Sequence, residues 1–308
     1  MSSVKIALVG LGKIARDQHI PALTASAEFE LVAAASPRGK LDGVRSFPSI
    51  AELFEAIPEV AAVALCTPPQ VRYETARYAL ERGRHVLLEK PPGVTLGEIQ
   101  ELAEIALRHA VTLFASWHCR HSPAVEPARA WLAGRQIRKI TITWKEDVRV
   151  WHPGQRWIWE AGGLGVFDPG INALSILTHL VPGTFRLCAA DLSYPENCQT
   201  PIAARLALAG PGDIPTVMEL DFLHQGAACW DIVFDTDAGG LRLSMGGKYL
   251  HVDDRSLATS DRTEYASLYA HFASLVRERR LDVDIAPLQI VADAFLSGRR
   301  IPVAAFTG

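Results

Sequence analysis

The fold is decided by one stretch near the amino terminus, VKIALVGLGKIA at residues 4–15. Its apolar beginning is typical of a buried strand, and the glycine-containing turn after it opens a helix. Gly10 permits the tight turn, Gly12 lets the backbone approach phosphate oxygens, and Ala15 allows close packing of the helix on the sheet. Since a helix N-terminus offers free N–H groups and a positive dipole end, we predict a dinucleotide pyrophosphate site here. The predicted cofactor contacts in this loop are Gly10, Gly12, Lys13 and Ile14.

Beyond this stretch, short apolar runs and longer amphipathic segments alternate through residue 115. The predicted strands are residues 4–9, 31–35, 60–66, 85–88 and 111–115, and the predicted helices are residues 14–26, 49–56, 70–82 and 95–108. Strand–helix alternation predicts right-handed βαβ crossovers and hence an α/β fold with a doubly wound parallel sheet, a Rossmann domain spanning residues 1–120. Ligands of such sheets bind at the carboxyl ends of the strands.

The second part of the chain, residues 121–308, has a different pattern, because strand-like segments follow one another with few helices between them. We predict an α+β domain with a large, mainly antiparallel sheet and helices over one face. The uncovered face predicts a homodimer or a higher homo-oligomer that associates through this C-terminal sheet. The final helix, residues 286–297, is a candidate to pack back on the first domain.

The composition excludes several classes of protein. The 308 residues are 49% hydrophobic and 21% charged, which is typical of a globular chain. A formal net charge of −3 provides no basic surface for nucleic acid or an anionic membrane. The longest apolar run, residues 60–66, is far shorter than the roughly 20 residues that span a bilayer. The five cysteines include no CxxC pair, so we expect neither a disulfide framework nor a zinc site. We predict a cytoplasmic enzyme without a signal peptide and without nucleic-acid or membrane partners.

The end of the second predicted strand decides which dinucleotide is preferred. A carboxylate at this position would accept hydrogen bonds from the ribose hydroxyls of NAD and repel the 2′-phosphate of NADP. The chain instead reads Ser36-Pro37-Arg38. Because a hydroxyl and a guanidinium suit a phosphate, we predict that Ser36 and Arg38 favour NADP, with NAD tolerated. An exposed charge in a solvated turn is the alternative for Arg38.

Three motifs together resemble those of the Gfo/Idh/MocA oxidoreductases. They are the loop at residues 10–15, Thr67-Pro68 after the third predicted strand, and Glu89-Lys90-Pro91 after the fourth. The resemblance covers essentially the whole chain and implies a nucleotide-binding domain followed by a substrate domain. It also implies a cis peptide bond near Pro91-Pro92 and further cofactor contacts at Thr67, Pro68, Glu89 and Lys90.

Longer stretches are most similar to the branch of this family that oxidises D-galactose or L-arabinose at C1. These stretches are residues 12–19, 144–149, 151–155 and 162–172. Two positions depart from the family pattern. Asn172 stands where many members have a histidine that transfers a proton, and an amide can only orient or bind. Arg72 stands where a histidine is frequent, and we expect it to be a charge on a helix surface.

Oxidation of a pyranose at C1 requires a base for the hydroxyl proton, a donor for the developing oxyanion and a clamp that orients C1. Lys90 follows the fourth predicted strand, at the edge where the nicotinamide is expected. Asp168 opens a helix in the second domain. We hypothesise that Asp168 is the general base and that Lys90 hydrogen-bonds O1. Two alternatives stay open: a neutral Lys90 as the base, and Asp168 as a helix N-cap.

A sugar site also needs an aromatic platform and fixed hydrogen-bonding groups. Trp151 and Trp230 are candidates for the platform, because an indole covers the C–H face of a pyranose and offers an N–H. The candidate partners of the sugar hydroxyls are His118, Glu146, His152 and Asn172. We expect no bound metal, since hydride transfer to a nicotinamide requires none.

The resulting functional prediction is an NADP-preferring aldose 1-dehydrogenase that converts D-galactose, L-arabinose or both to the lactone. One pocket could admit both sugars, which differ only in the exocyclic CH₂OH. Another reaction of the family, such as inositol or polyol oxidation, is the first alternative. A sensor that binds NADP without catalysis is the second, and the presence of both Lys90 and Asp168 argues against it.

Overall fold

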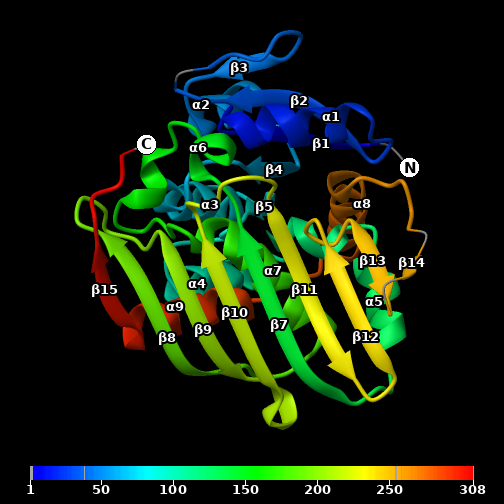
Figure 1. The fold of residues 1–308 in the computed structure, drawn as a ribbon. Coiled ribbons are helices and arrows are strands. Elements are labelled where there is room, and N and C mark those ends of the chain that lie inside the picture. Colours follow the sequence, from blue (N-terminus) through cyan, green and yellow to red (C-terminus); the bar gives the residue numbers. More distant parts are fainter. Residues whose placement is uncertain (1–2, 38, 254, 258, 308) are drawn as a thin grey trace. The chain divides into compact units, whose positions relative to one another are not determined.

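The computed structural model describes residues 3–37, 39–253, 255–257 and 259–307, and the chain divides into two compact units. Unit 1 comprises residues 1–118 and 263–285, and unit 2 comprises residues 119–262 and 286–308. Figure 1 shows the elements of both units in sequence colours. The first unit therefore ends near the predicted boundary at residue 120, but it also takes in a later segment of the chain.

Unit 1 contains a six-stranded parallel sheet in the order β3-β2-β1-β4-β5-β6. Its strands are β1 (Val4–Val9), β2 (Phe29–Ala35), β3 (Arg45–Phe47), β4 (Ala62–Leu65), β5 (His85–Glu89) and β6 (Leu113–Ser116). The direction of winding reverses at β1, where ligands of such sheets bind. The predicted Rossmann sheet is confirmed, and β3 is an additional strand that is too short and polar for an apolar run to reveal.

Helices cover both faces of this sheet. One core contains residues from α2 (Ile50–Ala56), α3 (Arg72–Glu81) and α4 (Leu96–Arg108). The other face is covered by the π-helical turn η1 (Ala15–His19), by α1 (Ile20–Thr24) and by α8 (Glu264–Glu278). Because η1 and α1 are short, apolar side chains of α8 complete this core. Helix α8, the penultimate helix, therefore belongs to unit 1, whereas the final helix belongs to unit 2.

Unit 2 contains a nine-stranded sheet in the order β14-β13-β12-β11-β7-β10-β9-β8-β15. Its strands are β7 (Ile137–Lys145), β8 (Arg186–Pro195), β9 (Ala203–Ala209), β10 (Pro215–Asp221), β11 (Cys229–Thr236), β12 (Gly239–Ser244), β13 (Tyr249–Val252), β14 (Arg255–Leu257) and β15 (Arg299–Val303). The β7–β10 and β8–β15 pairs are parallel and the other described pairs are antiparallel. The predicted mainly antiparallel sheet is confirmed.

One face of this sheet carries α5 (Val125–Leu132), α7 (Phe167–Leu180) and α9 (Ala286–Ser297), which lie behind the strands in Figure 1. Helix α7 is buried along most of its length. A Cβ at Gly170 would lie 2.7 Å from Leu220 Cδ1 of β10, so glycine allows α7 to approach the sheet closely. This packing fixes the first turn of α7, which contains Asp168. Within the described residues, no helix is long and apolar enough to cross a membrane.

Candidate active site

The predicted nucleotide loop has the geometry that a pyrophosphate site requires. Gly10 has φ +92°, and a Cβ there would lie 3.0 Å from backbone atoms of Cys66 and Thr67. At Gly12, by contrast, an added Cβ would meet no described atom within 4 Å, so protein packing does not demand glycine there. Open space next to a helix N-terminus suits the close approach of a phosphate, and the loop therefore fits a bound dinucleotide.

The other predicted cofactor contacts lie at the carboxyl ends of the same strands. Lys13 is exposed and forms an ion pair with Asp17, and Ile14 packs against the core beside η1. The Oγ1 atom of Thr67 is buried without a hydrogen-bond partner among the described residues, and Pro68 is exposed.

At the end of β2, the Ser36 N–H donates to the Phe47 carbonyl, and Arg38 lies outside the described residues. The Arg16 guanidinium, which sequence reasoning did not select, donates to the Lys40 carbonyl in the same loop at 3.4 Å.

The loop after β5 carries Lys90. Its peptide bond to Pro91 is cis, so the expected cis bond exists one position before Pro91-Pro92. Immediately before it, the Glu89 carboxylate is buried, and its Oε2 accepts the Lys90 backbone N–H at 2.9 Å. The backbone that positions the Lys90 side chain is therefore tied to the buried carboxylate.

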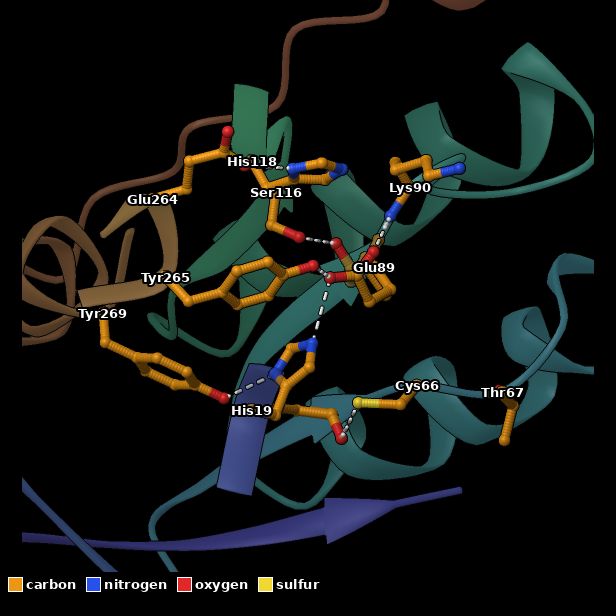
Figure 2. A network of polar contacts seen from close by, with 12 residues as sticks. His19, Cys66, Thr67, Glu89, Lys90, Ser116, His118, Glu264, Tyr265 and Tyr269 are labelled. Carbon is orange, nitrogen blue, oxygen red and sulfur yellow. Dashed lines mark hydrogen bonds and ion pairs between the residues drawn. The ribbon is translucent and has the colours of Figure 1, made fainter. Parts of the chain in front are cut away.

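Below this loop lies a polar network that sequence reasoning missed (Figure 2). Glu89 Oε1 accepts a hydrogen bond from the Tyr265 hydroxyl at 2.7 Å and lies 2.9 Å from His19 Nε2. The second ring nitrogen of His19, Nδ1, lies 2.7 Å from the Tyr269 hydroxyl. The four side chains come from η1, β5 and α8, so the Glu89 carboxylate links the helix that follows the nucleotide loop to the Lys90 loop.

Burial and charge oppose each other in this network. Burial by itself raises the pKa of Glu89, but the hydrogen bond and charge of His19, together with Tyr265 and His118, bring it down to about 2. Burial lowers the pKa of His19, while Cys66, Tyr269 and hydrogen-bonded Glu89 raise it, and its pKa lies well above the usual value. The structure therefore favours an imidazolium paired with a carboxylate.

Arg72 corrects one of our expectations. Instead of lying on a helix surface, its side chain is buried, with 2% of the residue exposed. Its guanidinium donates to the backbone carbonyls of Thr67, Glu89 and Pro91, which are the ends of β4 and β5 and the proline after Lys90. The prediction was wrong because apolar spacing locates the buried face of a helix but does not show that carbonyl groups converge on it.

Unit 2 brings four of the predicted site residues together. The backbone after β7 pairs with the end of β10, since Glu146 N–H donates to the Asp221 carbonyl at 2.9 Å. Glu146 Oε2 accepts the indole N–H of Trp230 at 2.8 Å, and Oε1 lies 2.9 Å from His152 Nε2. The other nitrogen, His152 Nδ1, lies 3.7 Å from Asp168 Oδ2. Asp168 and Glu146 are both buried.

The two tryptophans that we predict as the aromatic platform contact each other, and their role toward a sugar stays a prediction. The rings of Trp151 and Trp230 meet edge to face with centroids 4.7 Å apart, and Trp151 is 44% exposed. Asn172 lies one turn after Asp168 on α7, which places it on the same helix face. The N-cap of α7 is Val166, so Asp168 does not serve as the cap.

His118 differs from the other predicted sugar contacts. It belongs to unit 1, where Nδ1 lies 2.7 Å from Glu264 Oε2 and the ring stacks on Tyr265. Its role as a sugar contact stays a prediction.

Comparison with known proteins identifies the family. A model of the oxidoreductase family with an NAD-binding Rossmann fold, GFO_IDH_MocA, matches residues 4–116. The chain is 45% identical over 306 residues to a galactose 1-dehydrogenase of Pseudomonas fluorescens, with 99% of each chain covered. The chain belongs to the Gfo/Idh/MocA family of oxidoreductases. The predicted family and enzyme class are confirmed.

Two solved structures agree with the fold of this oxidoreductase. A D-galactose-1-dehydrogenase protein from Rhizobium etli matches with a TM-score of 0.95 and 49% identity, covering 100% of this chain and 99% of that one. KijD10, a 3-ketoreductase from Actinomadura kijaniata in complex with NADP, matches with a TM-score of 0.84. That match covers 98% of this chain and 99% of the other at 18% identity, so it shows the fold alone.

The first prediction concerns Arg72. Replacing it by methionine removes charged donors from three carbonyl oxygens, so we expect the free energy of unfolding to fall by about 3 kcal/mol. Affinity for the dinucleotide should fall as well, because the ends of β4 and β5 lose their common donor. Urea unfolding measures the change in stability, and fluorescence titration with NADPH measures the change in affinity.

Arg77→Met is the matched control, since Arg77 lies on the same helix in an exposed pair with Glu81 and should change stability little. Equal losses in the two variants would contradict this role of Arg72.

The second prediction concerns pH. The folded-state pKa of Glu89, about 2, lies below its ordinary 4.5, so its stabilisation is present above pH 4.5 and lost as the pH falls toward 2. The pKa of His19 is raised above 6.5, so its contribution is full below that pH and is lost as the pH rises through the raised value. The pair therefore contributes fully between pH 4.5 and 6.5.

In His19→Gln, we expect the free energy of unfolding at pH 6 to fall by about 3 kcal/mol, because Glu89 loses its charged partner. The deficit should shrink at pH 3, where the wild-type pair contributes less. Urea unfolding at both pH values tests this, with exposed His109→Gln as the control in the same unit. A deficit of equal size at pH 3 and pH 6 would rule out the ion pair as its cause.

Proposed function

We propose that this oxidoreductase is an NADP-preferring aldose 1-dehydrogenase that oxidises D-galactose, and L-arabinose as well, at C1 to the lactone. The observation that carries the proposal is the similarity to galactose 1-dehydrogenase, which spans both units at 45% identity. The cluster of Asp168, His152, Glu146 and Trp230 supports it, because acidic, imidazole and indole groups next to one another suit a sugar.

The dinucleotide would be held at the carboxyl edge of the sheet in unit 1. Gly10 and Gly12 would admit its pyrophosphate, with Lys13, Ile14, Thr67, Pro68, Glu89 and Lys90 as the further contacts. Ser36 and Arg38 would bind the 2′-phosphate, and the absence of a carboxylate from Ser36-Pro37-Arg38 favours NADP over NAD. When bound, the nicotinamide accepts the hydride from C1 of the sugar.

The chain's own groups handle the proton and the oxygen. Asp168 accepts the proton of the C1 hydroxyl as general base, and the Lys90 ammonium donates a hydrogen bond to O1 and stabilises its developing negative charge. The buried network under Glu89 and the donors of Arg72 would fix the backbone at Lys90. In the alternative assignment, neutral Lys90 is the base and Asp168 orients the hydroxyl.

Trp151 and Trp230 would cover one face of the pyranose, and Asn172 and His118 would bind its hydroxyl groups. D-galactose and L-arabinose have the same configuration at each ring carbon that bears a hydroxyl, so one set of partners serves both.

We further propose that unit 2 associates with a second copy through the face of its sheet that lacks helices. Val217 and Val233 on this face are 40% and 36% exposed.

The test is a spectrophotometric assay of NADPH formation with D-galactose, L-arabinose, D-glucose and myo-inositol, using NADP and NAD. We expect turnover of galactose and arabinose, with kcat/KM for glucose lower by about 10²-fold, because a misplaced hydroxyl leaves buried polar groups unpaired. NADP should be preferred over NAD. Oxidation of inositol without oxidation of aldoses would favour the first alternative. NADPH binding without turnover of any of these sugars would favour a sensor.

Variants then test the two catalytic assignments. Lys90→Met and Asp168→Asn should each lower kcat by about 10²- to 10⁴-fold. The exposed residues Lys248 and Asp261 provide the controls Lys248→Met and Asp261→Asn, which should retain activity. Near wild-type turnover in both site variants would refute the assignment.

A further inference from the structure

His152 lies between two buried carboxylates in unit 2. Its Nε2 is 2.9 Å from Glu146 Oε1, and its Nδ1 is 3.7 Å from Asp168 Oδ2. The three groups come from different segments: Glu146 follows β7, His152 follows α6 (Val148–Trp151), and Asp168 lies in α7. The side chain of His152 is 14% exposed, whereas each carboxylate side chain is 3% exposed. Of the three groups, solvent reaches the imidazole most easily.

The contacts of Glu146 determine which nitrogen of His152 carries a proton. An ionised carboxylate only accepts hydrogen bonds, and Glu146 Oε2 already accepts the indole N–H of Trp230 at 2.8 Å. Its Oε1 therefore accepts a hydrogen bond from His152 Nε2–H. In the neutral ring, Nδ1 then presents its lone pair toward Asp168.

Further contacts hold the ring in this orientation. The Phe222 ring packs against it with centroids 5.5 Å apart, and Gln155 Oε1 lies 3.4 Å from Nδ1, a long contact compared with the 2.9 Å between Nε2 and Glu146. Among the contacts that the structure describes for His152, those with titratable groups are Glu146 and Asp168. A proton on Nδ1 would face the Asp168 carboxylate, while Nε2–H faces Glu146.

A general base at Asp168 creates a requirement that this arrangement meets. After it accepts a proton, the carboxylic acid is buried and must lose that proton before the next turnover. His152 Nδ1 lies 3.7 Å from Asp168 Oδ2, and a shift of less than 1 Å would bring the two atoms to hydrogen-bond distance, about 2.8 Å.

We propose that His152 removes the catalytic proton from Asp168 and passes it to solvent, and that Glu146 positions the imidazole. This inference rests on the proposed function of Asp168. As C1 loses its hydrogen with the electron pair to the nicotinamide, the O1 proton moves to an Asp168 carboxylate oxygen. The new O–H bond then breaks as the N–H bond forms at Nδ1. Water finally accepts this proton, and neutral His152 and ionised Asp168 are restored.

The proposal changes two roles predicted from the sequence. Glu146 and His152 were expected to bind sugar hydroxyl groups, yet their side chains bind each other and Glu146 also binds Trp230. In the proposal Glu146 is a positioning residue that acts through His152, and His152 is a proton-transfer residue that acts on Asp168.

The decisive variant is His152→Gln, because glutamine can still donate to Glu146 but cannot carry a proton. With D-galactose, we expect kcat to fall by about 10²-fold, while the sugar KM and NADPH affinity change by less than about threefold. The pH profile of kcat should change shape, and added imidazole should restore part of the rate.

His251→Gln is the control, since His251 binds Ser244 and Ser256 and its replacement should leave kcat and its pH profile unchanged. An unchanged kcat and pH profile in His152→Gln, or a raised KM alone, would overturn the proposal.

A second measurement does not depend on catalysis. In protein labelled with ¹⁵N-histidine, His152 should show the Nε2–H tautomer at high pH in the wild type, and Glu146→Gln should mix the two tautomers. The Nδ1–H tautomer in the wild type would overturn the proposal. If the wild type oxidised no aldose, the proposed function would fail by itself, and the tautomer would still report whether Glu146 orients His152.

Discussion

The structure of unit 1 depends on one buried carboxylate, that of Glu89. It stays ionised at the end of β5 because His19 and Tyr265 hydrogen-bond it, with the pKa lowered to about 2. Without these partners, an isolated buried charge would be too costly and the carboxyl group would protonate. Its partners His19 and Tyr265 come from η1 and α8, respectively. The Glu89 carboxylate therefore connects η1, the end of β5 and α8. The Lys90 N–H donates to the same carboxylate, and the Arg72 guanidinium donates to the carbonyls of Glu89 and Pro91, so this network also holds the Lys90 loop.

Unit 2 also contains a buried carboxylate paired with an imidazole, but there solvent reaches the imidazole. The carboxylate is that of Glu146, and its partner His152 is partly exposed and faces a second carboxylate, whereas His19 is fully buried. Complete burial suits a fixed ion pair that positions backbone. Partial exposure suits a group that gains and loses a proton. This contrast is why we assign a positioning role to the pair in unit 1 and a proton-transfer role to His152.

Sequence reasoning found what local patterns encode. The glycine loop and apolar runs predict the sheet of unit 1, and the resemblance identifies the family and suggests Lys90 and Asp168 as candidate site residues. It missed contacts between distant segments: nothing local to Arg72 indicates three converging carbonyls, and nothing in residues 264–278 shows that Tyr265 and Tyr269 meet His19. Local pattern likewise does not show that β15 pairs in parallel with β8, which lies far away in the chain.

The central proposal is that the Lys90 ammonium and the Asp168 carboxylate act on the same sugar oxygen. A crystal structure of the wild-type enzyme with NADPH and D-galactose bound tests it most directly, since this abortive complex does not turn over. We expect Lys90 Nζ and one Asp168 carboxylate oxygen each to lie within hydrogen-bond distance of O1, about 2.6–3.2 Å. A sugar whose O1 is hydrogen-bonded to neither group would contradict the account.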